Sequence, residues 1–80
     1  MAKDYVGNEL KVSDVVLDLN ERVVCRIVKI WNKSVTTDVQ LERENEHLKR
    51  YGHRQVDETT CRNHKLAKCF VRILLPEEQA

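Results

Sequence analysis

The stretch from Leu10 to Leu41 constrains the fold of this chain more than any other part of the sequence. It contains three short runs rich in β-branched residues, and the polar dipeptides Asn20-Glu21 and Asn32-Lys33 separate them. Runs of this length and composition, bounded by turn residues, are typical of β-strands joined by tight turns. The stretch therefore predicts the front half of a small antiparallel barrel or curled sheet.

Alternation of apolar and polar side chains defines four expected strands, because such alternation marks the buried face of a strand. In the first strand the apolar face contains Val15, Leu17 and Leu19. The second strand carries apolar side chains on both faces, which is typical of a central or strongly bent strand. Pro76 lacks a backbone N–H and is expected to end the last strand. The strands are expected over residues 14–19, 22–31, 34–41 and 69–75.

Residues 42–68 form a charged insertion between the expected strands. The run from Glu42 to Tyr51 consists largely of good helix formers. Gly52 is well suited to the first position after a helix, so one short helix is expected in the 42–52 region. The alternative is a strand that continues from Leu41, turns near Gly52 and returns through Val56.

The opening of the chain resembles the start of SH3-like barrels of the KOW and Tudor kind. In those barrels an apolar-x-x-Gly-Asp-x-Val motif leads into a strand, a tight bend and a second apolar strand. Here the corresponding residues are 10–16, followed by 24–30, and Ser13 occupies the position of the glycine. The resemblance covers roughly residues 1–40. It implies a mainly β fold of four to five antiparallel strands, an SH3-like barrel or curled sheet, to which the middle segment adds one short helix.

The length of 80 residues allows one domain with one modest core. We expect residues 1–80 to form that domain, with loose termini at 1–9 and 76–80. No apolar run approaches the ~20 residues that span a bilayer, and Lys3 and Asp4 lie where a secretory signal needs apolar residues. The three cysteines lack the paired spacing of a disulfide framework. These features predict a cytoplasmic protein without a membrane partner.

Charge is unevenly distributed, although the formal net charge is only +1. Residues 43–69 contain seven Lys or Arg against four Asp or Glu, whereas 1–42 and 70–80 each carry a net charge of −1. Cationic side chains can neutralise phosphates, and Tyr51 or His53 could stack on a base. Trp31, at a strand end, is a further candidate anchor. The candidate contact residues are Trp31, Arg43, Lys49, Arg50, Tyr51, His53 and Arg54.

The sequence favours a non-enzymatic binding module without a cofactor. Its two glycines form no phosphate-binding loop, and no carboxylate pair stands in an apolar setting. The first hypothesis is an accessory or regulatory protein, such as many phages encode, that docks on a larger protein or nucleoprotein assembly. A mixed-charge surface with Tyr, Trp and Arg is typical of such interfaces. The alternative hypothesis is direct RNA or DNA binding through the basic segment 43–69.

A third hypothesis concerns zinc. Cys61, His64 and Cys69 have a Cys-x-x-His-x₄-Cys spacing that resembles part of a zinc knuckle, and thiolates and imidazole are suitable zinc ligands. A fourth ligand would have to come from outside this spacing. In the alternative interpretation, Cys25 and Cys69 are small apolar side chains inside strands, and Cys61 is an exposed thiol.

Overall fold

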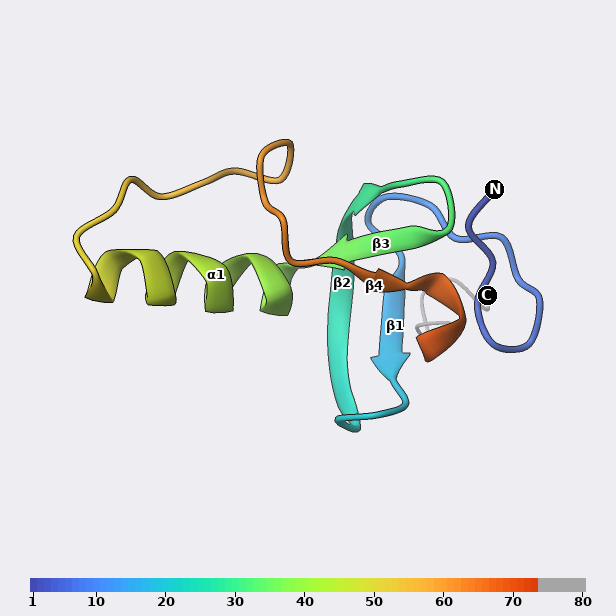
Figure 1. The fold of residues 1–80 in the computed structure, drawn as a ribbon. Helices are drawn as coiled ribbons and strands as arrows, with labels where there is room; N and C mark the ends of the chain where they lie inside the picture. Colours follow the sequence, from blue (N-terminus) through green and yellow to red (C-terminus); the bar gives the residue numbers. More distant parts are fainter. Residues whose placement is uncertain (74–80) are drawn as a thin grey trace.

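The computed structural model describes residues 1–73, which form a curled antiparallel sheet of five strands and one α-helix (Figure 1). The strand order is β4-β3-β2-β1-β5. The predicted mainly β fold of four to five strands with one helix is confirmed. The elements are β1 (Val15–Asp18), β2 (Val23–Ile30), β3 (Ser34–Thr37), α1 (Asp38–Arg50), β4 (Lys65–Leu66), the 3₁₀ turn η1 (Ala67–Cys69) and β5 (Phe70–Arg72).

Strand β2 joins the two halves of the curl. It pairs with β1 along its first half and with β3 along its second half. The register shifts between Ile27 and Lys29, and next to this bulge the N–H of Arg26 donates to the Asp38 carboxylate at 3.0 Å. A bulge bends a strand and increases its twist. The prediction of a central, bent second strand is therefore confirmed.

The predicted buried face of the first strand is wrong by one residue. Val16 and Asp18 are the buried residues of β1, whereas Val15 and Leu17 are half-buried. An inward carboxylate is possible here because Lys65 of β4 donates to Asp18 at 2.6 Å. This partner lies 47 residues away along the chain, so local alternation carries no sign of it.

Helix α1 begins earlier than predicted, and the strand expected over 34–41 ends at Thr37. The Thr37 hydroxyl accepts from the N–H of Gln40 at 3.3 Å, and the Gln40 side chain accepts from the N–H of Thr37 at 2.8 Å. This reciprocal capping box fixes a helix start. Val39, in the first helical turn, still packs against the core, which is why the strand-like alternation continues past the cap.

The end of α1 follows the expectation for Gly52. Gly52 has φ +74°, a backbone conformation that glycine adopts without steric cost. Its N–H donates to the carbonyl of Lys49 at 3.1 Å, and the N–H of His53 donates to that of Leu48 at 2.8 Å. These two bonds form a Schellman motif, which satisfies the last carbonyls of the helix. The helix interpretation of this segment is confirmed over the strand alternative.

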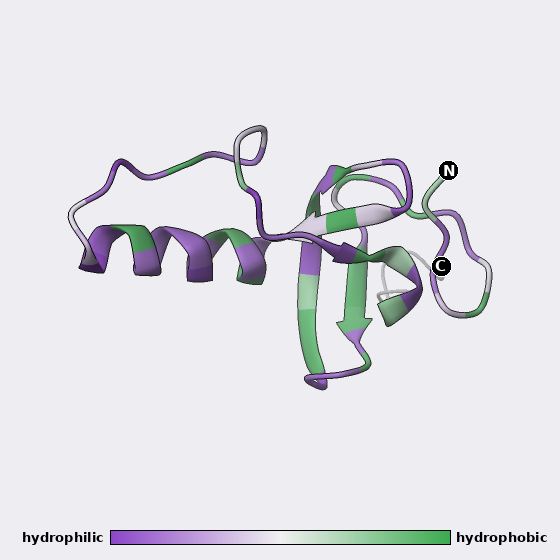
Figure 2. Ribbon diagram, viewed as in Figure 1, coloured by the Kyte–Doolittle hydropathy of each residue, from purple (hydrophilic) through white to green (hydrophobic). Residues whose placement is uncertain are grey.

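The core lies inside the curl. Phe70, Ile27, Val16 and Val35 are at most 1% exposed. Figure 2 shows that hydrophobic residues concentrate on the strands, whereas α1 and the segment after it are mostly hydrophilic. Helix α1 is thus an addition to the core rather than its cover. No helix in residues 1–73 combines the length and apolar character that crossing a membrane requires.

The N-terminal segment packs against β5 and differs from the loose terminus expected over residues 1–9. Ala2 and Asp4 are buried. The N–H of Tyr5 donates to the Phe70 carbonyl, and the N–H of Arg72 donates to the Asp4 carboxylate, both at 2.8 Å. These bonds satisfy the outer edge of β5. The last strand, expected over 69–75, is observed as β5 over Phe70–Arg72, and Ile73 follows it outside the strand. The loose end expected over residues 76–80 lies outside the described residues, as does Pro76.

Candidate functional site

Helix α1 extends away from the curled sheet (Figure 1). Its 13 residues, at 1.5 Å each, span about 20 Å, and the molecule measures 44 Å along its longest axis. Gln40, in the first turn, is the only buried residue of the helix. Most of the helix surface is therefore free of the sheet core.

The segment after the helix, residues 51–64, runs back along α1, and we call it the return loop. The Asn45 side chain fixes it by a paired contact, in which its amide donates to the Val56 carbonyl at 2.9 Å and its oxygen accepts from the Val56 N–H at 2.7 Å. The N–H of Arg62 donates to the Glu44 carboxylate at 3.1 Å. Polar helix side chains thus satisfy the backbone of the loop.

A groove lies between the helix and the return loop. Its volume is about 500 Å³, within the range of ligand-binding pockets. Leu48 and Val56, both half-buried, are its apolar residues. We call it the helix–loop groove, and its polar lining residues are Glu44, His47, Arg54, Thr60 and Arg62.

A smaller depression of about 190 Å³ lies on another side of α1 and is lined by Arg43, Glu46, His47 and Arg50. His47 borders both hollows, and its ring centroid lies 4.9 Å from that of Tyr51. Tyr51 is 63% exposed. The C-terminal end of α1 therefore places Arg50, Tyr51 and Arg54 around His47.

Three further candidate residues lie on or beside the same helix. Lys49 and His53 are exposed near its C-terminal end. Arg43 donates to both carboxylate oxygens of Glu21, at 2.7 and 2.8 Å. This hydrogen bonding and charge raise the pKa of Arg43 above its ordinary value. Arg43 is thus directed to the β1–β2 turn, which sequence reasoning did not anticipate.

Trp31 does not join the candidate residues of the helix. It lies between β2 and β3, where its indole N–H donates to the Thr36 hydroxyl at 3.0 Å. Its ring centroid lies 5.2 Å from that of His64 and 5.3 Å from the Lys29 Nζ. The predicted site is therefore split into an α1 group and a separate aromatic pair.

Cys25 is buried inside β2, as one of the two interpretations expects, but Cys61 and Cys69 differ from that interpretation, and no zinc site is assembled within residues 1–73. Within residues 1–73, no three His, Cys, Asp or Glu side chains form a group that could hold a metal ion. The fold thus does not assemble Cys61, His64 and Cys69 into a ligand set. Cys61 is buried rather than exposed, and Cys69 is half-buried in η1 rather than in a strand. Burial raises the pKa of the Cys61 thiol, as it does for the buried Cys25.

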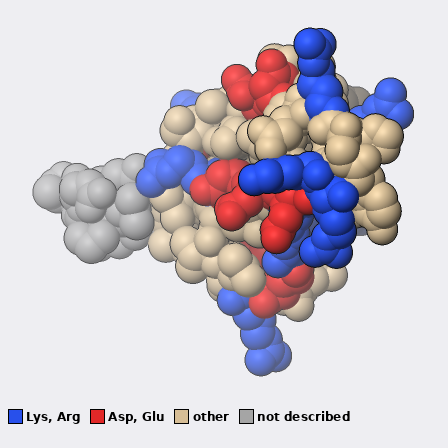
Figure 3. Space-filling view, turned by 90° about the vertical axis from the view of Figure 1, so that its left-hand side faces the viewer, with Lys and Arg blue, Asp and Glu red and all other residues tan. Residues whose placement is uncertain are grey.

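Charge on the helix side is mixed. Figure 3 views the molecule from this side and shows acidic side chains lying among basic ones. Residues 47–54 contain Lys49, Arg50 and Arg54 and no acid, but Glu44 and Glu46 border the two hollows. The surface therefore presents alternating charge rather than one continuous basic patch.

Among the residues that line the helix–loop groove, only Arg54 was a candidate from the sequence. Val56 enters the sequence analysis only as part of a possible returning strand, and Leu48 is not among the candidate residues. The one available signal was the isolation of these two apolar residues within a highly polar segment. Their proximity depends on the pairing of Asn45 with Val56, which no local pattern reveals.

No family model, curated protein or solved structure matches this chain. Function is therefore argued from the geometry of the site and from its chemistry.

Proposed function

We propose that this chain is a non-enzymatic accessory protein that docks on a larger protein or nucleoprotein assembly and holds a segment of a partner protein in the helix–loop groove. The observation that carries the proposal is a groove of about 500 Å³ built on a helix in which only Gln40 is buried. Its apolar residues Leu48 and Val56 share the lining with the exposed Arg54, and the exposed Tyr51 lies against His47, which also lines the groove. Tyr and Arg are enriched among residues that dominate binding energy.

The lining of the groove specifies the chemistry of the partner segment. Arg54 and Arg62 provide two cations, whereas the Glu44 carboxylate already accepts from the Arg62 N–H. An apolar side chain of the partner would displace water from Leu48 and Val56. We therefore propose a segment with an apolar residue flanked by carboxylates, since carboxylates pair bidentately with Arg.

The SH3-like interpretation of the sheet belongs to this proposal. Two features support it: the strand order, with η1 as the short link between the last two strands, and the backbone of Ser13. Ser13 has φ +80°, the conformation for which the related motif uses glycine. Under this interpretation α1 and the return loop are an insertion that adds a binding surface to a small barrel.

Nucleic-acid binding through residues 43–69 is the second hypothesis. It is weaker because Glu44 and Glu46 border the basic residues of α1, and carboxylates repel phosphates. Arg43 is also held by Glu21. Binding driven by phosphates would require a more continuous basic surface.

The test is a capture experiment with nuclease-treated lysate of the source organism, using the whole chain as bait. Arg54→Glu reverses a charge on the groove, and Lys68→Glu makes the same change on η1, at the opposite end of the molecule in Figure 1. We expect wild type and Lys68→Glu to capture the same protein and Arg54→Glu to lose it. A peptide from that protein, apolar and flanked by acids, should bind with the same dependence on Arg54.

Two results would overturn the proposal. One is capture that survives Arg54→Glu undiminished, which would show that the groove is not the docking site. The other is capture that disappears on nuclease treatment but persists in Lys68→Glu, which would favour the second hypothesis. Circular dichroism of each variant establishes that the charge reversal leaves the fold intact.

A further inference from the structure

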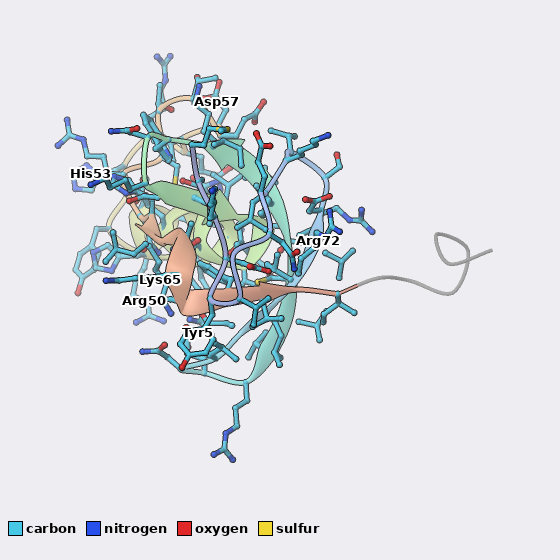
Figure 4. The ribbon with its side chains drawn as sticks, turned by 90° about the vertical axis from the view of Figure 1, so that its right-hand side faces the viewer. Tyr5, Arg50, His53, Asp57, Lys65 and Arg72 are labelled. Atoms are coloured by element: carbon cyan, nitrogen blue, oxygen red, sulfur yellow. The ribbon has the colours of Figure 1, made fainter. Side chains whose placement is uncertain are left out.

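A third hollow lies at the opposite end of the molecule from the helix tip. Figure 4 views this side, where η1 and the N-terminal segment lie. The hollow has a volume of about 270 Å³ and is lined by Met1, Lys3, Lys33, Leu66 and Lys68. Three chain segments far apart in the sequence thus each bring a lysine to one place. We call it the lysine hollow.

The lysine hollow has no compensating acid among its lining residues. In residues 1–73, the ammonium groups of Lys3, Lys33 and Lys68 form no ion pair within 4.0 Å. All three side chains are exposed. Because like charges raise each other's energy, a cluster of this kind favours a bound anion.

An aromatic pair belongs to the same surface. Successive side chains of a strand point to opposite faces. In β4 Lys65 points into the curl toward Asp18, so Leu66 points outward and is 46% exposed. His64, directly before β4, is exposed and lies against Trp31. Lys29 adds a fourth cation beside the Trp31 ring.

We propose that this surface binds single-stranded nucleic acid, with its phosphates on Lys3, Lys33 and Lys68 and its bases against Leu66 and the Trp31–His64 pair. A single strand presents phosphates and flat unpaired bases side by side, which matches cations beside an aromatic pair and an exposed apolar side chain. A duplex hides its base faces, so only its phosphates could contact this surface, through the lysines. The site is distinct from the helix–loop groove, so this proposal does not depend on the proposed function.

The experiment uses the full chain and a fluorescein-labelled oligothymidylate of about ten nucleotides, within the usual site size of such surfaces. Binding is followed by anisotropy and by the fluorescence of Trp31, the only tryptophan in the chain. We expect binding to quench Trp31. Because three lysines contact phosphate, the slope of log affinity against log salt should be about −2.

The variants separate this surface from the helix. Lys33→Glu/Lys68→Glu should weaken binding by at least about tenfold at low salt and flatten the salt slope by about 1.4. Arg50→Glu, the matched charge reversal on α1, should change the affinity less than about twofold. The capture experiment separates the two surfaces in the opposite way. Lys68→Glu should weaken nucleic-acid binding here but leave protein capture by the helix–loop groove intact.

Three outcomes would overturn the proposal. The first is no anisotropy change at low salt. The second is a loss of affinity in Arg50→Glu as large as in the lysine double variant, which would move the contact to α1. The third is equal binding of polyglutamate with equal Trp31 quenching, which would assign the hollow to acidic peptides. Circular dichroism of the lysine double variant keeps a folding defect from being mistaken for lost binding.

Discussion

Lys65 and Asp18 join the two sides of the curled sheet by an ion pair, with 2.6 Å between the Lys65 Nζ and the Asp18 Oδ2. Lys65 lies on the edge strand β4, and Asp18 lies on β1, three places away in the strand order. The side chains are 25% and 7% exposed, respectively, and the Lys65 Nζ also lies 5.6 Å from the Phe70 ring centroid. The pair thus bridges strands that no backbone ladder connects, and it holds the curl closed.

Removal of this bridge should destabilise the fold. Lys65→Met keeps the side-chain length but leaves the buried Asp18 carboxylate without its cationic partner. We expect a loss of about 1–3 kcal/mol in the free energy of unfolding, measured by urea denaturation. Lys33→Met, at an exposed lysine, is the matched control and should change stability by less than about 0.5 kcal/mol. Equal stabilities of the two variants would mean that the bridge does not hold the curl.

The same bridge predicts a pH dependence. Burial raises the pKa of Asp18, but hydrogen bonds from Lys65 and from the N–H groups of Glu21 and Asn20 outweigh it, so the pKa is lowered. For Asp4, burial is likewise outweighed by hydrogen bonds, from Arg72, Asn8 and Val6, and the pKa is lowered.

Groups with a lowered folded-state pKa bind fewer protons in the folded than in the unfolded chain. Their contribution to stability is complete above the unfolded pKa of about 3.9. It is lost as the pH falls through the lower, folded pKa. Urea denaturation between pH 6 and pH 2 should therefore show falling stability, and Asp18→Asn should flatten the decline. A wild-type stability that does not change over this range would contradict the account.

Ser13 adopts a backbone conformation that is strained for serine and that glycine adopts without steric cost. With φ +80° it stands in the left-handed region, and it is exposed. Ser13→Gly should raise the free energy of unfolding by about 0.5–1 kcal/mol, since relief of the strain exceeds the entropic cost of glycine. Ser34→Gly, within β3, should lower stability by a similar amount. A loss of stability in Ser13→Gly, measured by thermal denaturation, would show that this serine makes contacts that outweigh its backbone strain.

The capping box decides where strand β3 becomes helix α1. Thr37→Ala removes the hydroxyl that accepts from the Gln40 N–H and should cost about 1–2 kcal/mol. Thr37→Ser retains an acceptor oxygen and should keep most of the stability. Urea denaturation compares the two, and far-UV circular dichroism reports the helix. Indistinguishable variants would indicate that packing of Val39, rather than the cap, starts the helix.

The burial of the cysteines predicts their order of modification. Cys25 and Cys61 are 6% and 2% exposed, and burial raises the pKa of both thiols. At pH 7 both should resist iodoacetamide in the folded protein, because the thiolate is the reactive form. The half-buried Cys69 should react first. Mass spectrometry of the peptides follows each site. If Cys61 in the folded protein were modified as fast as in the urea-unfolded protein, the return loop would not bury it.

The sequence predicts what depends on local pattern. The central position of β2 follows from its two apolar faces, and the end of α1 follows from Gly52. Both features depend on residues that are close together in the sequence, so they can be predicted without knowledge of the fold. Four of the five strands and the single helix follow for the same reason, whereas β4 (Lys65–Leu66) lies in the segment expected to be a charged insertion.

What the sequence does not predict depends on distant partners. The inward side of β1 is set by Lys65, which is far from Asp18 along the chain. The burial of Asp4 depends on the backbone of Arg72. The candidate site is split in two for a similar reason. Trp31 contacts His64, which is distant along the chain, and does not join the candidate residues of α1. The helix–loop groove depends on one asparagine that pairs with a loop backbone.

The most direct test of the central claim, that the helix–loop groove holds a partner protein, is photo-crosslinking from Tyr51. Benzoylphenylalanine replaces Tyr51 in one variant and the exposed Val24 of β2 in another, and both are irradiated in nuclease-treated lysate. We expect one protein crosslink from position 51 that position 24 lacks and that Arg54→Glu abolishes. Crosslinks of equal yield from both positions, or a position 51 crosslink unaffected by Arg54→Glu, would contradict it.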